Sequence, residues 1–244
     1  MPILETREVS VRFGGHMAVN DVSLTVDEGI ITGLIGPNGA GKTTTFNVIT
    51  GLQPPTRGRV MLDGEDITKA SAHKRAKAGI ARTFQRLELF GSLTVRDNVL
   101  TAAELHRIDA QTPEAATEAL LDRVGLTDLA GQRADSLSTG MARLVELARA
   151  LACRPRVLLL DEPASGLDEP ETDRFADILV DLANDGLAIL LVEHDVPLVM
   201  RLCSHIAVLN FGELLAAGTP QQIQQDQRVV DAYLGQGTDV GESS

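Results

Sequence analysis

The stretch that decides the fold of this chain is Gly36-Pro37-Asn38-Gly39-Ala40-Gly41-Lys42-Thr43-Thr44. It matches the pattern G-x-x-x-x-G-K-[ST], in which a glycine-rich backbone turns its N–H groups toward a row of phosphates. All nine residues are therefore candidates for nucleotide contact, with Lys42 reaching the outer phosphates and the Thr43 hydroxyl binding Mg²⁺. The flanks agree, because residues 30–35 predict a short buried strand and residues 43–52 predict a helix whose positive N-terminus faces the anion.

A second strand ends in two carboxylates. Residues 157–160 are Val-Leu-Leu-Leu, and Asp161 and Glu162 follow directly. A buried strand of this kind places its acids at the carboxyl edge of the sheet, where α/β proteins bind ligands. Acids also end strands as plain helix caps, so the functional interpretation depends on the phosphate loop upstream. In that context Asp161 is expected to hold Mg²⁺, and Glu162 to orient or deprotonate the attacking water.

Three further polar positions are candidates for the same site. Gln85 can serve both Mg²⁺ and the attacking water, although it could also be an ordinary loop residue. His194 follows an apolar strand and could bond a γ-phosphate, although a lone histidine often has a purely structural role. Ser138 opens a predicted helix with Gly140 in its first turn, which is either a plain cap or an anion site.

One aromatic residue is a candidate for base binding. Phe13 lies 23 residues before Gly36 and could stack on an adenine, or it could be a core residue. Aromatic residues make up only 3% of the chain, which is why this one is considered at all.

Composition restricts the class of partner. The net charge is −12, from 34 acidic and 22 basic residues, which argues against nucleic-acid binding and against direct adhesion to anionic lipid. Apolar runs have strand length only, and no leader pattern is visible, so we expect a soluble chain held at any membrane by protein partners. Cys153 and Cys203 lie in apolar surroundings and show no metal-binding spacing, so both are interpreted as core residues.

The order of elements predicts an α/β fold. Strand patterns surround the phosphate loop and return after residue 155, whereas helical signals fill the region between them. We therefore expect one domain over residues 1–235, with a core and β subdomain from 1–90 and 151–235, and a helical subdomain over 91–150. Residues 236–244 are small and polar and are predicted to be disordered.

Taken together, these motifs resemble the ATP-binding cassette (ABC) ATPases. Gly36–Thr43 is similar to the Walker A loop, Gln85 to the Q-loop, residues 137–141 to the signature, and residues 158–162 to the Walker B strand. Residues 165–168 resemble the D-loop, His194 the switch histidine, and Phe13 the adenine-stacking aromatic. The resemblance implies a P-loop NTPase core with a mixed sheet, an antiparallel β subdomain and an inserted helical subdomain. It also implies a head-to-tail dimer that closes on two ATP molecules with Mg²⁺, each held by one chain's Walker A and the other chain's signature.

The signature departs from the family pattern at two positions. Thr139 stands where glycine is usual and Met141 where glutamine is usual, whereas Ser138 and Gly140 remain. We expect an active ATPase in which a Cβ at Thr139 strains a backbone that approaches phosphate closely.

A narrower resemblance lies outside these motifs. The runs at 79–85, 192–196 and 231–235 are similar to the ATPase subunits of branched-chain amino acid importers and related amide importers. That resemblance implies permease subunits contacted near Arg86–Ser92, a second ABC ATPase or a second copy, an extracytoplasmic binding protein reached indirectly, and a peripheral position on the cytoplasmic face of the membrane. The alternatives are a lipid or lipopolysaccharide export ATPase and, less favoured, a soluble ABC clamp acting on ribosomes or DNA.

Overall fold

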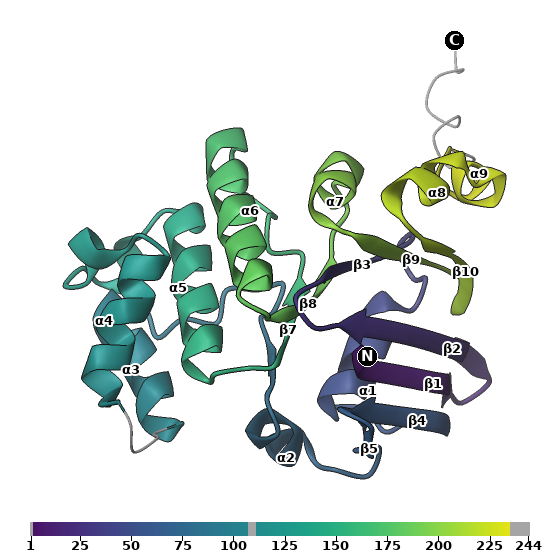
Figure 1. Cartoon of the computed structure of the whole chain (residues 1–244), viewed down its shortest axis with the longest axis horizontal. Coiled ribbons are helices and arrows are strands. Elements are labelled where there is room, and N and C mark those ends of the chain that lie inside the picture. Colours follow the sequence, from purple (N-terminus) through teal and green to yellow (C-terminus); the bar gives the residue numbers. More distant parts are fainter. Residues whose placement is uncertain (1, 107–110, 235–244) are drawn as a thin grey trace.

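The computed structural model describes residues 2–106 and 111–234 as two sheets with helices around them (Figure 1). The larger sheet has the strand order β10-β9-β3-β8-β7-β6, in which all neighbours are parallel except β9 and β10. Its strands are β3 (Ile31–Ile35), β6 (Ile80–Arg82), β7 (Val157–Asp161), β8 (Ala188–Val192), β9 (His205–Asn210) and β10 (Glu213–Gly218).

The smaller sheet is antiparallel, with the order β2-β1-β4-β5. Its strands are β1 (Pro2–Phe13), β2 (His16–Asp27), β4 (Arg57–Leu62) and β5 (Glu65–Asp66). The hairpin between β1 and β2 turns at Gly14 and Gly15. This sheet packs across one face of the larger sheet, with α1 (Lys42–Thr50) buried between them (Figure 1).

Both faces of the larger sheet are buried, which explains its apolar strands. In β7, Leu158 and Leu160 belong to the core beneath the helices, whereas Val157 and Leu159 belong to the core shared with α1 and the small sheet. The alternation follows from the two-residue period of a strand. It leaves Asp161 at the end of the strand, where the carboxyl edge of the sheet begins.

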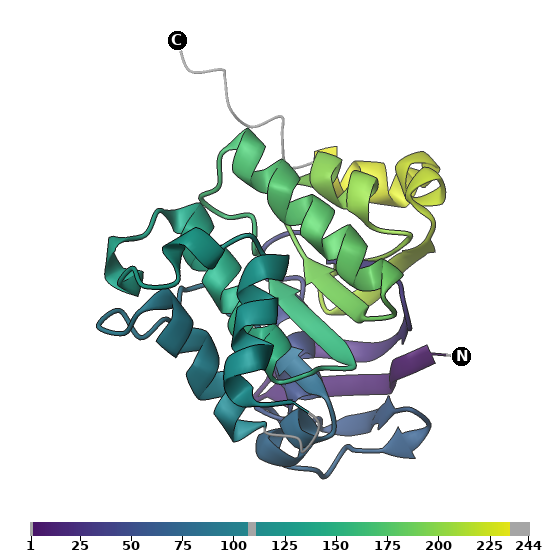
Figure 2. The same ribbon diagram turned by 60° about the vertical axis from the view of Figure 1, so that its left-hand side comes forward.

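The helices that cover the outer face of the large sheet come from the second half of the chain. Figures 1 and 2 show α6 and α7 on the face opposite the small sheet. The helices of the sheet region are α2 (Ala72–Lys77), α6 (Glu169–Asn184), α7 (Val196–Leu202), α8 (Pro220–Gln225) and α9 (Gln227–Leu234).

The region between β6 and β7 is helical. It contains α3 (Val95–Leu105), α4 (Pro113–Arg123) and α5 (Thr139–Ala152), with short 3₁₀ turns at Thr127–Leu129 and Ala134–Ser136. Thr94, Thr112 and Ser138 cap the three helices through their side chains. Their buried faces meet around Val95, Leu121 and Leu147.

The α/β fold class predicted from the sequence is confirmed, with a mixed sheet, an antiparallel sheet and the helical region. The helix α9 was not predicted, and the tail prediction for 236–244 concerns residues outside those described. Within 2–106 and 111–234, no helix is both long enough and apolar enough to cross a membrane.

Candidate functional site

The phosphate-binding loop connects β3 to α1. Gly41 is the N-cap of α1, with a φ of 103° and no side-chain hydrogen bond at the helix start. A Cβ at Gly41 would lie 2.7 Å from the carbonyl oxygen of Ala18, and one at Gly36 would lie 2.1 Å from that of Leu209. Glycine is required at both positions because the backbones of β2 and β9 enclose the loop. The first turn of α1 thus presents N–H groups that can donate hydrogen bonds to an anion.

Lys42 turns back into this loop. Its side chain is buried, and Nζ donates to the carbonyl oxygens of Gly36 at 2.6 Å and Pro37 at 3.0 Å. Burial lowers the pKa of Lys42, while the nearby charges of Glu162 and Asp161 act in the opposite direction. The ammonium group therefore lies in the electrostatic field of both strand-end carboxylates, as a phosphate-binding lysine beside a metal site should.

Asp161 is buried at the end of β7. Its Oδ2 accepts a hydrogen bond of 2.7 Å from Arg82 Nη2, and the two side chains are 8% and 6% exposed. Arg82 also donates to Asn47 Oδ1 at 2.6 Å, which connects the carboxylate to α1.

Glu162 is the centre of a polar cluster at the same edge. Its Oε2 accepts from Gln85 Nε2 at 2.8 Å, and its Oε1 lies 2.5 Å from His194 Nε2. Glu162 has a φ of 50°, in the left-handed region that costs a residue with a side chain on the order of 1–3 kcal/mol. Such strain persists only where the surroundings over-determine it, and it is found most often at functional sites.

A buried glutamate holds the loop around this cluster. Glu193 accepts from the backbone N–H of Ala164 at 2.7 Å and from that of His194 at 3.2 Å. Burial raises the pKa of Glu193, and these two N–H donors oppose that shift. The Glu193 side chain therefore holds the backbone near Glu162, at Ala164, and the backbone of His194 itself.

The N-terminus of α5 lies in a different part of the molecule. Ser138 Oγ accepts from Met141 N–H at 3.3 Å and donates to Glu171 Oε1 at 3.4 Å. A Cβ at Gly140 would lie 2.3 Å from the Glu171 carboxyl group, so the packing itself requires glycine. The structure thus places Ser138 and Gly140 against the start of α6 and not against the phosphate loop.

Further along α5, an arginine connects the two regions. Arg143 donates to the carbonyl oxygens of Phe84 at 3.0 Å and Gln85 at 2.6 Å, and to Glu146 Oε2 at 2.9 Å. Glu146 in turn accepts from the N–H of Glu88 at 2.8 Å. The segment that carries Gln85 is therefore attached to α5 through its backbone.

Most of the predicted site residues are gathered at the sheet edge. The structure brings together Lys42, Gln85, Asp161, Glu162 and His194. The remaining loop residues differ in exposure: Asn38, Gly39 and Thr43 are exposed, Pro37 and Thr44 are half-buried, and Ala40 is buried.

Phe13 lies apart from this cluster, at the end of β1. It is 48% exposed beside the β1–β2 turn, so it is available to a ligand and is not a core residue.

The residues that could bind a metal fit Mg²⁺ held together with phosphates. Among the described residues, no group of three His, Cys, Asp or Glu side chains could hold a metal by itself. Mg²⁺ characteristically takes one or two protein oxygens and completes its shell with phosphates and water. Asp161, Gln85 and the exposed hydroxyl of Thr43 offer hard oxygen donors of that kind.

Three residues of this site were missed by sequence reasoning. Arg82, Asn47 and Arg143 have long-range partners that no local pattern encodes. An arginine ending an apolar strand was the one available signal for Arg82.

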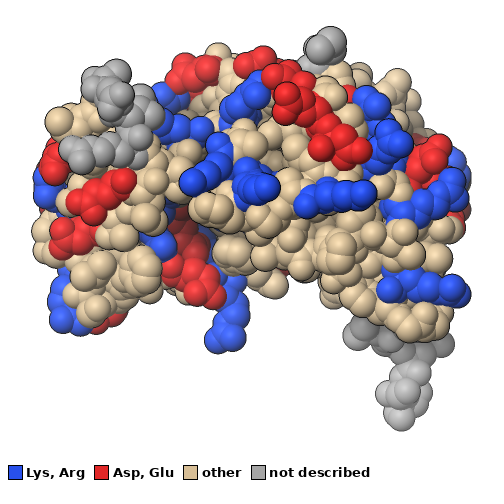
Figure 3. Space-filling model, turned by 90° about the horizontal axis from the view of Figure 1, so that it is seen from below, with Lys and Arg blue, Asp and Glu red and all other residues tan. Residues whose placement is uncertain are grey.

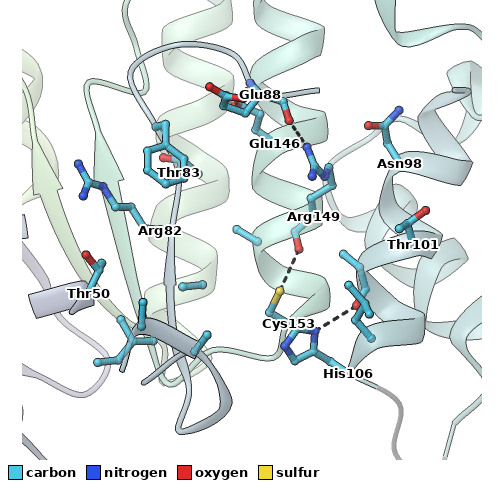
Figure 4. Close-up of a pocket in the computed structure, with 18 of the residues that line it drawn as sticks. Thr50, Arg82, Thr83, Glu88, Asn98, Thr101, His106, Glu146, Arg149 and Cys153 are labelled. Carbon is cyan, nitrogen blue, oxygen red and sulfur yellow. Dashed lines mark hydrogen bonds between the residues drawn. The ribbon is translucent and has the colours of Figure 1, made fainter. Parts of the chain in front are cut away.

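A cavity of about 420 Å³ lies beside the Gln85 segment, between the sheet and the helical region (Figure 4). Its lining is mostly apolar, with Phe84 and Phe90 exposed by 43% and 48% and Leu105 by 78%. The guanidinium of Arg149 lies over the Phe90 ring at 4.8 Å and donates to the Glu88 carbonyl oxygen. Part of the predicted partner segment Arg86–Ser92 therefore lines a concave, largely apolar surface.

Comparison with known proteins gives two family matches. Residues 19–165 match the family described as "ABC transporter", and residues 213–239 match "Branched-chain amino acid ATP-binding cassette transporter".

Three similar proteins align with nearly the whole chain. The chain is 42% identical to the "High-affinity branched-chain amino acid transport ATP-binding protein BraF" of Pseudomonas aeruginosa, covering 96% of this chain and 98% of that protein. It is 40% identical to LivG of Escherichia coli K12, a protein of the same description, with the same coverage. It is also 37% identical to the "Lipopolysaccharide export system ATP-binding protein LptB" of Escherichia coli K12, covering 97% and 98%.

Solved structures agree with these relatives. The ADP conformation of MJ1267, an ATP-binding cassette of an ABC transporter, superposes with a TM-score of 0.87 at 31% identity, covering 96% of this chain and 99% of that one. The dimeric post-hydrolysis state of the cassette MJ0796, bound to ADP and Pi, superposes with a TM-score of 0.79 at 26% identity, covering 89% and 98%.

Proposed function

The chain belongs to the ATP-binding cassette family of transporter ATPases, and from this premise we propose that it energises an importer of branched-chain amino acids or related amides. The observation that carries the ATPase chemistry is the Gln85–Glu162–His194 cluster beside Lys42 and Asp161. The observation that favours an importer is the match of residues 213–239 to the branched-chain amino acid group, together with BraF and LivG.

The proposed chemistry uses the residues of the sheet edge. Backbone N–H groups of residues 36 and 38–44, together with the Lys42 ammonium, bind the phosphates of ATP. Glu162 orients the attacking water and accepts its proton, while Gln85 and His194 hold the Glu162 carboxylate from two sides. When bound, Mg²⁺ would be held by Asp161, Thr43 and Gln85 and would neutralise charge on the phosphate oxygens. Phe13 stacks on the adenine.

The N-terminus of α5 has its role in a dimer. Ser138 and Gly140 lie away from the chain's own phosphate loop, so they bind the nucleotide of a second subunit. The dimeric MJ0796 structure supports such pairing, with either a second copy or a related ATPase as the partner. Closure on ATP and opening after hydrolysis would then move the attached permeases.

The cavity beside Gln85 is proposed as the permease contact. Its apolar lining and its position next to Arg86–Ser92 suit an amphipathic helix from a membrane subunit. Since Arg143 attaches this segment to α5 and Gln85 attaches it to Glu162, a movement in the groove would reach the hydrolysis site directly. In this proposal the subunit lies peripherally on the cytoplasmic face of the membrane, and the extracytoplasmic binding protein is reached through the permeases.

Two alternatives remain as outcomes of the test. Lipopolysaccharide export has the support of the 37% identity to LptB, which is below the 42% identity to BraF, and residues 213–239 match the branched-chain amino acid group. A clamp on ribosomes or DNA is disfavoured by the net charge of −12, and the face in Figure 3 carries acidic side chains beside its basic ones.

The test is co-purification from native membranes in detergent with ATP, using a tagged Glu162→Gln chain to hold the closed state. We expect two permeases and a binding protein for a small amide or amino acid. Introducing Phe90→Asp should remove the permeases without changing nucleotide binding, whereas Val180→Asp, at a half-exposed position on α6, should not. Lipopolysaccharide-export membrane proteins or ribosomal proteins in place of importer subunits would overturn the proposal.

A further inference from the structure

Arg82 is a buried cation at the centre of the site, and no nucleotide-binding motif gives it a role. It is the last residue of β6, paired in register with Leu159 of β7, and its side chain is 6% exposed. A charged group is buried at this depth only when its partners compensate for the lost hydration. Those partners therefore indicate what Arg82 does.

The guanidinium connects two elements of the site. One nitrogen donates to Asn47 Oδ1 on α1 at 2.6 Å, and the other donates to Asp161 Oδ2 at the end of β7 at 2.7 Å. The helix α1 is the one that begins with Lys42 and carries the phosphate loop at its N-terminus. The relative position of that helix and the metal-binding carboxylate is thus fixed by one planar fork.

Two aromatic rings lie close to the same guanidinium. Its central carbon is 5.4 Å from the centroid of Phe46 and 5.0 Å from that of Phe84. Phe46 belongs to α1, and Phe84 immediately precedes Gln85. A cation between two ring faces is stabilised electrostatically and has little rotational freedom. The Nε atom is buried with no hydrogen-bond partner among the described residues, so the other contacts account for the placement.

The charge of Arg82 balances the carboxylates. The carboxylates of Asp161 and Glu162 both attract the ammonium of Lys42, which is turned into the phosphate loop. A second cation, Arg82, holds Asp161 through its Oδ2. The carboxylate is therefore oriented before any ligand arrives, and such preorganisation is a general feature of metal sites.

We propose that Arg82 is a positioning residue that orients Asp161 for Mg²⁺ and ties it to α1 and to the Gln85 segment. Arg82 does not touch the nucleotide in this proposal, which rests on the proposed function through the role given to Asp161. Lysine at this position keeps the charge but cannot donate to Asn47 and Asp161 in the same planar geometry.

The test compares Arg82→Lys with a matched control, Arg75→Lys. Arg75 is also buried and also bonds α1, but its donors go to carbonyl oxygens of Val48, Ile49, Thr68 and Ala70 and not to a carboxylate. Nucleotide affinity is measured with a fluorescent ATP analogue in excess Mg²⁺ and again in EDTA. Hydrolysis is measured as a function of Mg²⁺ concentration, and unfolding is followed thermally.

We expect Arg82→Lys to raise the Mg²⁺ concentration for half-maximal hydrolysis by about tenfold, the lower end of what supporting residues contribute to metal sites. The gain in nucleotide affinity that Mg²⁺ provides should shrink, whereas affinity in EDTA stays close to that of the parent chain. Arg75→Lys should lower thermal stability and leave both Mg²⁺ responses unchanged. Asn47→Ala, which removes one anchor of the fork without altering any charge, should shift the Mg²⁺ response in the same direction by a smaller factor.

The two possible failures are distinguishable. If the parent chain neither hydrolyses ATP with Mg²⁺ nor gains affinity from it, the proposed function itself is wrong. If the parent does so and Arg82→Lys has the same Mg²⁺ response while only its stability falls, Arg82 is a structural residue and the inference is overturned.

Discussion

The carboxyl edge of the large sheet and the N-terminus of α5 both belong to the proposed nucleotide chemistry, but they are built differently. At the sheet edge, Asp161 and Arg82 are buried, and Glu162 is held by side chains from two other segments. At the start of α5, Ser138 and Thr139 are exposed. The Ser138 hydroxyl accepts from Met141 N–H at 3.3 Å within its own helix and donates to Glu171 Oε1 of α6 at 3.4 Å. The first region is fixed by the chain's own fold, whereas the second faces outward.

The two regions differ in what they can bind without a second molecule. A site made of buried groups with several partners is preorganised and can bind phosphates and metal within one chain. An exposed helix N-terminus gains partners only when another molecule arrives. Arg143 connects the two regions, because it lies on α5 and holds the backbone of Gln85.

The largest effect is expected at the sheet edge, from Glu162→Gln. The amide keeps the size of the side chain but cannot take a proton from water, so hydrolysis should fall by about 10²–10⁴-fold, the usual contribution of a general base. Nucleotide binding should survive, since the phosphates are bound by other groups. Steady-state ATPase assays and a titration with labelled ATP measure the two quantities separately.

Lys42→Ala is the contrasting variant for that experiment. It removes the ammonium that lies against the phosphate loop, so nucleotide binding itself should weaken. If the Glu162→Gln chain hydrolyses ATP at the normal rate, Glu162 is not the general base. The preorganised sheet edge would then not supply the proton acceptor for hydrolysis.

The link between the two regions is tested by Arg143→Met. Glu146 would lose its ion-pair partner in a buried position, where leaving one charge uncompensated costs about 3–5 kcal/mol. Chemical denaturation should show that loss, and the double variant Arg143→Met, Glu146→Met should recover much of it. Below the unfolding transition, hydrolysis should fall more than nucleotide binding because the Gln85 backbone is released. An equal loss of both would mean that α5 does not act through Gln85.

How much of this could be foreseen depends on the range of the interactions. The phosphate loop, the strand ending in Asp161 and the caps Thr94, Thr112 and Ser138 follow from short local patterns, and the structure contains each of those elements. The capping box of Asp168 and Glu171, which begins α6 at Glu169, is another local signal of this kind. The sequence contains this capping box, but the prediction made from residues 165–168 is only their resemblance to the D-loop.

The rest of the site depends on contacts between distant residues. Arg82 and Asp161 are 79 positions apart, and Arg143 and Gln85 are 58 apart. No local rule pairs a particular arginine with a particular carboxylate or carbonyl oxygen at such separations. The segment around Glu162, whose φ is 50°, is likewise held from a distance, because Glu193 accepts from the N–H of Ala164, 29 positions away.

The smallest expected effect is at the exposed end, from Thr139→Gly. Among the described residues other than glycine, six have a positive φ and Thr139 is not one of them, so its Cβ strains no backbone in this chain alone. Its methyl group lies 3.3 Å from the place of a Cβ on Gly166, so the side chain is directed toward the segment that begins α6. Any loss of activity caused by the Thr139 side chain therefore arises when the phosphate bound to a second subunit approaches. Glycine at this position should raise ATPase activity a few-fold and leave the ATP affinity of the isolated chain unchanged. Met141→Gln, the other departure from the signature pattern, serves as the comparison because it changes a side chain and keeps the backbone N–H that donates to Ser138 Oγ. Unchanged ATPase activity in Thr139→Gly would show that this helix end tolerates a side chain. The two regions would then differ in burial but not in how closely a phosphate approaches the backbone.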